Sequence, residues 1–98
     1  MEPEIVLVIY NSSIEDEVME ALTKAGMTQY TKFTNLRGVG ELSEPRLNTQ
    51  IWPGTNSMLL ICVPRGHARN ILEGVRRLKE IHEQEGVKAF VLPVTEIL

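Results

Sequence analysis

Residues 5–10 read IVLVIY, an uninterrupted run of apolar and β-branched side chains near the start of the chain. A short run of this kind is typical of a central β-strand that is buried on both faces. Because successive side chains of a strand point to opposite faces, such a strand needs apolar cover on both sides of its sheet. The run therefore predicts a position in the middle of a sheet.

Two amphipathic helices are expected downstream of this strand. The first carries Ile14, Val18 and Leu22 on one face, with Ser13 as its expected N-cap and Gly26 as the residue that ends it. The second follows the third strand, with Arg65, His67 and Arg69 at its start and Gly86 as the residue that ends it. Its apolar face is expected to contain Ala68, Ile71, Leu72, Val75, Leu78 and Ile81.

Three further strands are expected, at residues 30–38, 57–63 and 88–94. Pro93 cannot donate to a ladder, so the last strand should lie at an edge of the sheet or end there. Each helix must cross one sheet face between two strands. The order predicts an α+β protein in which residues 1–98 form a single domain: a ferredoxin-like βαββαβ sandwich, with two helices on one face of a four-stranded antiparallel sheet.

That architecture leaves the second face of the sheet without cover. The apolar run at residues 5–10 nevertheless demands cover on both sides. Self-association with the open sheet faces turned inward is the simplest way to provide it.

Composition excludes several classes of protein. The net charge is −3 and aromatic residues make up 5% of the chain, so neither a basic face nor a stacking platform for nucleic acid is expected. A single cysteine, Cys62, favours a reducing compartment. The N-terminal segment resembles neither a signal peptide nor a membrane span. We therefore expect a cytoplasmic protein that does not insert into a membrane.

Residues 37–56, RGVGELSEPRLNTQIWPGTN, separate the second and third strands. A connection of this length exceeds the limit of about 12–15 residues that is usual for an unstructured link in a compact domain. We interpret it as an arm that binds an effector or a partner protein. The alternative is a loop packed in a subunit interface. The residues expected to contact a partner are Arg37, Glu41, Arg46, Trp52 and Asn56.

A second set of residues is suited to an anionic ligand. Gly38 and Gly40 would let backbone N–H groups approach a phosphate, and Lys88 could meet it as a point charge. Arg65 and Arg69 lie at the start of the second helix, where cations are unfavourable unless an anion is bound. Together these residues could form an anion-binding cleft between subunits. The alternatives are a bend at the glycines, an exposed lysine, and arginines screened by solvent or by an acid of a neighbouring subunit.

The chain resembles PII-type signalling proteins over nearly its whole length. The similarity lies in the helix after the first strand, in the Gly-x-Gly turn that opens the family's long T-loop, and in a lysine followed by an apolar strand and Pro-Val. The matching residues are Ile14, Glu17, Val18, Glu20, Ala21, Leu22, Gly26, Gly38, Gly40, Lys88, Phe90, Val91, Pro93 and Val94.

The resemblance implies a homotrimeric regulator whose 37–56 arm is equivalent to the T-loop. It implies an adenine nucleotide (ATP, ADP or AMP) as the effector, bound at subunit clefts, and a transporter or enzyme as the target protein. The chain also departs from the family's pattern. The Gly-rich nucleotide-binding loop is replaced by HEQEGVK at residues 82–88, Glu41 stands where an arginine is usual, and the arm contains no tyrosine.

Two other functions remain open. The size and topology are also similar to CutA-type proteins, and the end of the arm is similar to PII-like proteins encoded beside metal-efflux pumps, which would make the protein metal-responsive. In that subgroup a histidine is expected at the position of Gln50, and no His or Cys spacing here matches a zinc or copper site. A module that binds a partner without any small ligand is the third class. Enzymatic activity is not expected, because no nucleophile–base pair has a recognisable spacing.

Overall fold

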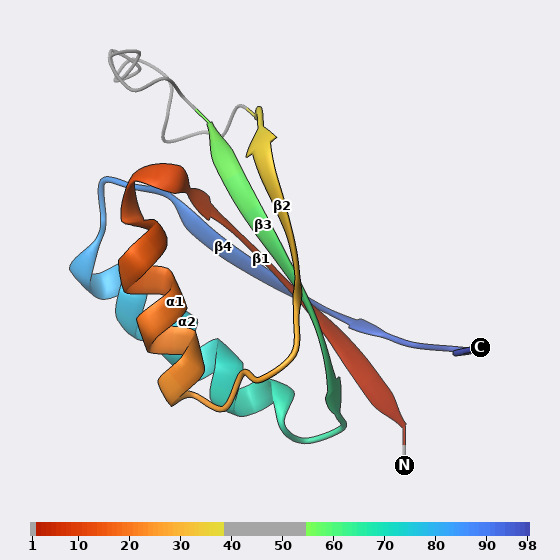
Figure 1. Cartoon of the computed structure of the whole chain (residues 1–98). Helices are drawn as coiled ribbons and strands as arrows, with labels where there is room; N and C mark the ends of the chain where they lie inside the picture. The colour runs from red at the N-terminus through yellow and green to blue at the C-terminus, as the bar shows by residue number, and fades with distance from the viewer. Residues whose placement is uncertain (1, 39–54) are drawn as a thin grey trace.

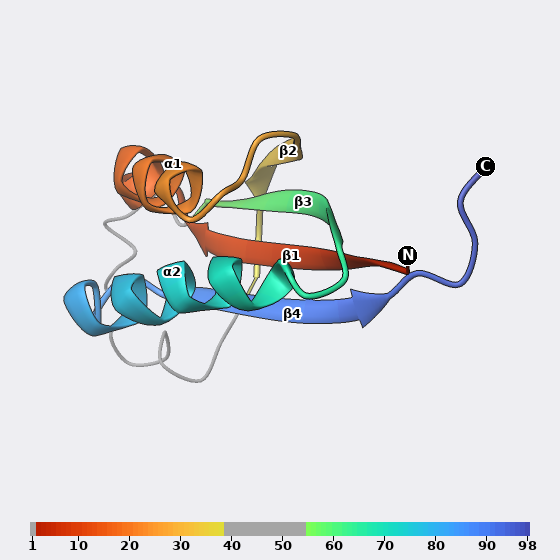
Figure 2. The ribbon, with the colours of Figure 1, turned by 90° about the horizontal axis from the view of Figure 1, so that it is seen from below.

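The structure is a computed structural model that describes residues 2–38 and 55–98. Its elements follow the order predicted from the sequence. They are β1 (Pro3–Asn11), the 3-10 turn η1 (Ser12–Ile14), α1 (Glu15–Lys24), β2 (Thr31–Leu36), β3 (Asn56–Pro64), α2 (Ala68–Ile81) and β4 (Val87–Pro93). Figure 1 shows both helices on the same side of the sheet, and Figure 2 shows the same layers from below. The predicted ferredoxin-like α+β fold is confirmed.

The four strands form one antiparallel sheet in the order β2-β3-β1-β4. The apolar first strand therefore lies between two others, as its sequence predicts. The 37–56 arm leaves the sheet at one end of the strands, which we call the loop end. The residues there are Asn11, Leu36, Asn56 and Val87. The far end is the opposite end of the strands, where β1 begins and where β3 and β4 finish.

The side chains of β1 alternate as a strand requires. Val6, Val8 and Tyr10 point toward the helices and are buried. They form the core with one apolar face of each helix and the facing side of β3. The buried apolar residues are Val6, Val8, Tyr10, Ile14, Val18, Leu22, Met27, Leu59, Ile61, Val63, Ala68, Ile71, Val75, Leu78 and Val87.

The other side of the sheet carries no layer within the described residues. We call it the open face. The register places Leu7 opposite both Leu60 and Phe90, and Ile9 opposite Met58, so apolar side chains cross this face from strand to strand. Three of the residues on this side are well exposed large side chains: Phe33 at 40%, Phe90 at 46% and Leu92 at 42%.

The end of α1 follows the sequence, whereas its start does not. Gly26 has φ 108°, its N–H donates to Thr23 O at 3.1 Å, and the N–H of Met27 donates to Leu22 O at 2.9 Å. This is a Schellman motif, which closes a helix with a left-handed residue. Ser13 is not the N-cap of α1: its N–H instead donates to Oδ1 of Asn11 at 2.9 Å, which caps the preceding 3-10 turn.

The apolar face of α2 is shorter than predicted. Ala68, Ile71, Val75 and Leu78 are buried, but Ile81 in the last turn is 72% exposed, because at about 100° per residue it lies at the margin of the face that these four residues define. The two helices meet closely at Gly74. A Cβ placed there would lie 3.3 Å from the Ala25 Cβ of α1.

Candidate functional site

At the loop end, backbone hydrogen bonds connect the end of β1 to the second end of the 37–56 arm and to the residue before β4. The N–H of Ser12 donates to Thr55 O at 3.1 Å, and the N–H of Asn11 donates to Gly86 O at 3.2 Å. Thr55, the residue before β3, is therefore tied to the turn after β1, and Gly86, the residue before β4, is tied to the last residue of β1. The backbone at this end is a rigid frame from which the arm departs.

A bulge in β2 directs the chain into the arm. The pairing of β2 with β3 shifts register between Phe33 and Leu36, and Asn35 between them has φ 56°. Asparagine tolerates this left-handed conformation better than most side chains. This bulge was not predicted, although an asparagine inside a strand pattern is a signal that could have indicated it.

A polar network lies beside this frame, between β1, α1 and β2. The hydroxyl of Tyr10 donates to Oε1 of Glu15 at 2.6 Å, and the ammonium of Lys32 forms an ion pair with Oε2 of the same carboxylate. Ser57, which is buried, shares a 3.1 Å hydrogen bond with the hydroxyl of Ser12. Nothing in the sequence pattern predicted this network, because its members come from separate elements.

The network shifts the pKa of two of its groups. Burial, and then the hydrogen bond to Glu15, raise the pKa of Tyr10, so its phenol stays protonated and acts as a donor. Burial alone would raise the pKa of Glu15. The hydrogen bonds from Lys32 and Tyr10 outweigh that effect and lower its pKa, so the carboxylate stays ionised.

The predicted cations do not come together within one chain. Arg65 and Arg69 follow β3 at the far end, whereas Lys88 is at the start of β4 at the loop end. The nine residues of β3 separate these two ends by about 26 Å at ~3.3 Å per residue. A cleft that contains all three side chains therefore needs two subunits.

Arg65 also has an acidic partner in its own chain. Its Nη1 is 2.9 Å from Oε1 of Glu2, and both side chains are well exposed. Such a pair contributes little to stability. It nevertheless offsets part of the charge at the start of α2, where no acid occupies the first turn and no side chain caps the helix.

Gly38 lies at the loop end beside Asn56. A Cβ added to Gly38 would meet Nδ2 of Asn56 at 3.5 Å, which is ordinary van der Waals contact. The described neighbours therefore do not require a glycine there. Arg37 is exposed and Asn56 is half-buried. The other predicted residues of the arm, Gly40, Glu41, Arg46 and Trp52, lie outside the described residues.

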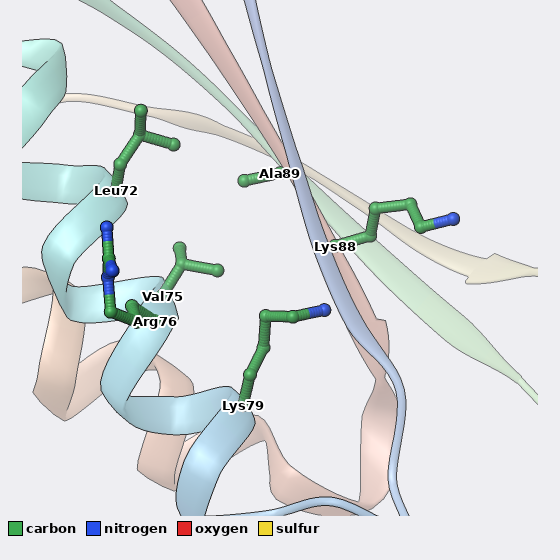
Figure 3. A pocket seen from close by; sticks show the side chains of 6 residues that line it. All are labelled: Leu72, Val75, Arg76, Lys79, Lys88 and Ala89. Carbon is green, nitrogen blue, oxygen red and sulfur yellow. The ribbon is translucent and has the colours of Figure 1, made fainter.

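A groove runs between α2 and the edge strand β4. Its volume is about 340 Å³, and it is lined by Leu72, Val75, Arg76, Lys79, Lys88 and Ala89. Figure 3 shows the side chain of Lys79 on α2 extending toward β4. The side chain of Lys88 points away from α2, on the other side of the strand. The ammonium group of Lys79 donates a hydrogen bond to Val87 O at 2.9 Å.

Metal-binding groups do not converge in the described part of the chain. No group of three or more His, Cys, Asp or Glu side chains is placed to hold an ion there. Nδ1 of His82 lies 3.7 Å from Oε1 of Glu85 at the end of α2. Among the described residues, no helix is long and apolar enough to cross a bilayer.

Known structures show the same fold. One is CPII from Thiomonas intermedia K12, a nitrogen regulatory PII-like protein, in a complex with ADP, AMP and acetate: 21% identity, TM-score 0.68, covering 97% of this chain and 90% of CPII. Another is a putative PII-like signalling protein from Thermus thermophilus: 24% identity, TM-score 0.65, covering 96% of this chain and 88% of that one. At these identities the similarity establishes the fold alone.

A more distant structure has the same architecture. A protein of the DUF3240 family from Shewanella baltica OS155 is 12% identical, with a TM-score of 0.65 and coverage of 98% of this chain and 93% of its own. No curated protein sequence matches this chain.

The sequence family gives the assignment that the structures alone do not. The family described as nitrogen regulatory protein P-II matches residues 4–98, which include both helices and all four strands apart from Pro3, the first residue of β1. The chain therefore belongs to the nitrogen regulatory protein P-II family.

Proposed function

We propose that this protein is a PII-like regulator and not an enzyme. In this proposal a homotrimer binds a small anionic effector, an adenine nucleotide, at clefts between subunits. The 37–56 arm carries the signal to a target protein such as a transporter or an enzyme. The observation that carries the proposal is the match of residues 4–98 to the P-II family, a family of signalling proteins.

The open face supports assembly. A sheet face that exposes Phe33, Phe90 and Leu92 is unusual for a monomeric protein. Three sheets turned toward a common axis would remove these side chains from water, and the sheet edges would then meet at subunit boundaries. Cys62 on the same face favours a reducing compartment, the cytoplasm, as the place of action.

An adenine nucleotide is the effector best supported by the relatives. CPII structures contain ADP with AMP and bicarbonate, or ADP with AMP and acetate. In this chain, Lys88 and the arginines at the start of α2 would supply positive charge. Because these cations lie at opposite ends of one sheet, a ligand that contacts both sets would join two subunits.

The frame at the loop end supports the role of the arm. Both ends of the arm are held by β-structure, at Leu36 and Asn56, and by the backbone hydrogen bond of Ser12 to Thr55. An effector bound beside this frame would change the conformational order of the arm without deforming the sheet.

The proposal is tested by two measurements on the full chain. Size-exclusion chromatography coupled to light scattering should give the mass of a trimer at micromolar protein concentration. Titration calorimetry with ATP, ADP, AMP and cyclic AMP should detect binding of at least one of them. A monomer, or no heat with any of the four at a concentration that keeps the oligomer intact, would overturn it.

The arm provides a second readout. Trypsin cleaves after arginine and lysine, and Arg37 and Arg46 both lie in the arm. We expect the bound nucleotide to change the rate of cleavage at these two sites, while cleavage after Lys24 at the end of α1 stays constant. Equal rates with and without nucleotide would show that the arm does not respond to the effector.

A further inference from the structure

We propose that β2 is a locally unfolding strand whose attachment to the domain is controlled by the Lys32–Glu15 ion pair, and that its release repositions the first end of the 37–56 arm. The inference goes beyond the proposed function, because it concerns how one strand is attached and does not require a bound nucleotide. Three features of the molecule support it: the side chains of β2, its pairing with β3, and the partners of Glu15.

β2 contributes no side chain to the buried core. The core contains residues of β1, β3 and β4 but none of β2. At the position of β2 that faces the helices, opposite the fully buried Leu59, the chain has Lys32. Phe33 points to the open face and is 40% exposed, and Leu36 is half-buried. Within its own chain β2 therefore gains little from apolar burial, which is the main stabilising contribution in folding.

The backbone pairing of β2 is short and interrupted. β3 pairs with β1 along its whole length, Asn56–Pro64, but with β2 only at Met58–Leu60 and at Asn56. The bulge lies between these two stretches, and Asn35 within it has φ 56°. This left-handed conformation is uncommon for a residue other than glycine, and dissociation of β2 would release it. Few ladder hydrogen bonds therefore oppose dissociation of β2 from β3.

The Lys32–Glu15 ion pair supplies the attachment that apolar packing does not. The two side chains are partly buried, with exposed fractions of 27% for Lys32 and 31% for Glu15. The hydroxyl of Tyr10 on the central strand also donates to the carboxylate at 2.6 Å, so Glu15 keeps a partner when Lys32 leaves. An ion pair of this exposure is weakened by salt, whereas a buried apolar contact does not depend on charge. The attachment of β2 is therefore adjustable.

β4 is the other edge strand and provides a reference within the same molecule. The hydrogen bond from the N–H of Asn11 to Gly86 O fixes the alternation of its ladder. The residues of β4 whose backbone groups bond to β1 are Lys88, Phe90 and Leu92. Those whose backbone groups point away from β1 are Val87, Ala89 and Val91. β4 pairs with β1 without a bulge and places Val87 in the core, so we expect it to stay attached when β2 dissociates.

Release of β2 would move one end of the arm and not the other. β2 ends at Leu36 and leads directly into the arm (Figure 1). The second end stays connected to β1, because the N–H of Ser12 donates to Thr55 O at 3.1 Å. The Lys32–Glu15 pair would therefore set the position of Arg37, the first residue of the arm.

Amide hydrogen exchange of the full chain, resolved by residue in NMR spectra, tests the inference. Even the slowest amides of β2 should exchange about tenfold or more faster than those of Lys88 and Phe90 in β4. Lys32→Gln should speed exchange in β2 by about fivefold, the size expected for loss of a partly exposed ion pair. The same substitution should leave exchange in β4 within about twofold of the wild type.

The matched control is Lys24→Gln. Lys24 also pairs with a glutamate, Glu20, but on the surface of α1, where the two side chains are 76% and 69% exposed. Its removal should leave exchange in β2 unchanged. The double variant Glu15→Gln/Lys32→Gln should exchange no faster in β2 than the more affected single variant, because both substitutions break the same pair.

Ionic strength provides a test that needs no substitution to be tolerated. A rise from about 0.05 M to about 0.5 M NaCl should speed exchange in β2 of the wild type, because the added ions screen the pair. The same rise should have no effect on β2 in Lys32→Gln. Trypsin should also cleave after Arg37 faster in Lys32→Gln than in the wild type, with the rate of cleavage after Lys24 unchanged.

The outcomes separate this inference from the proposed function. If β2 exchanges as slowly as β4, or if Lys32→Gln speeds exchange equally in every strand, the pair is an ordinary structural contact and the inference is overturned. None of these measurements uses a nucleotide. A protein that binds no nucleotide, but whose β2 exchanges rapidly and responds to Lys32→Gln, would support the inference and overturn the proposed function.

Discussion

Lys32 on β2 forms an ion pair with Glu15, the first residue of α1, across 17 residues of sequence. Because β2 is an edge strand that pairs only with β3 in the described sheet, this contact adds a direct link between β2 and the helical layer. The same carboxylate accepts a hydrogen bond from the hydroxyl of Tyr10. Glu15 thus links the central strand, the first helix and the strand that leads into the arm.

Removal of the Tyr10 hydroxyl should destabilise the protein. In Tyr10→Phe the ring stays in the core, while Glu15 loses one of its two donors in a partly buried place. We expect a loss of about 1 kcal/mol in the free energy of unfolding, measured by urea denaturation at a fixed protein concentration. Tyr30→Phe is the control, because Tyr30 is exposed and should change the value by less than ~0.5 kcal/mol. Equal effects of the two substitutions would contradict a structural role for the network.

The ionised state of Glu15 should make stability fall in acid. Its pKa is lower in the folded state than in the unfolded chain, so the unfolded chain takes up the proton first as the pH decreases. The stabilisation from this group is complete above about pH 5 and is lost as the pH falls through the folded-state pKa. Urea midpoints measured from about pH 6 down to about pH 3 should therefore decline less steeply in Glu15→Gln than in the wild type. A decline of the same slope in both proteins would mean that Glu15 is not the group responsible.

A large side chain at Gly74 should force the two helices apart. Leucine favours a helix more than glycine does, so any loss of stability must come from packing. A Cβ alone would already lie 3.3 Å from Ala25 Cβ and 3.4 Å from Leu22 Cδ2. We expect Gly74→Leu to cost about 1–3 kcal/mol and to lower the melting temperature. Gly86→Ala, where nothing lies within 4 Å of an added Cβ, should have a much smaller effect. A Gly74→Leu protein as stable as the wild type would show that the helices have room to separate.

A charge on the open face should prevent self-association. Phe90→Asp places a carboxylate among the apolar side chains that we expect to be covered by other subunits. Light scattering should then give the mass of a monomer, or of a species that dissociates on dilution at micromolar concentration. Ile81→Asp makes the same chemical change at a more exposed residue, 72% against 46%, but at the end of α2 and away from the open face. It should leave the mass unchanged, and a loss of assembly in both variants would point to a different interface.

The order of elements was predictable because it depends on local patterns. The run at residues 5–10 has the composition of a central strand, and β1 does lie between β3 and β4. Pro93 indicated an edge or an end, and β4 is an edge strand that ends at Pro93. Gly26 has the left-handed conformation expected of a residue that closes a helix.

Details that depend on distant contacts were not predictable. Ser13 has the spacing of an N-cap, but Asn11 takes that place first and caps a 3-10 turn before α1 begins. Ile81 was predicted to lie on the apolar face of α2, yet its side chain is 72% exposed. Arg65 was predicted to line an anion-binding cleft, with screening by solvent or by an acid of a neighbouring subunit as the alternative. In the structure it pairs with Glu2 from the start of its own chain.

The candidate site was the least predictable part. Lys88 was identified through a family pattern, and on β4 its side chain points away from α2. Arg76 and Lys79 have no distinctive spacing and look like ordinary exposed residues of an amphipathic helix. Only the folded structure shows that Lys79 donates a hydrogen bond to the backbone of the edge strand β4.

That contact also limits how the protein can aggregate. A bare edge strand can template the addition of strand after strand until fibrils grow. On β4, Lys79 occupies the outward carbonyl of Val87, and Pro93 at the other end has no hydrogen to donate. Within the described sheet, only Ala89 and Val91 remain free between them, too short a stretch to recruit long foreign strands. Lys79→Ala should therefore fibrillate faster than the wild type when incubated at high concentration.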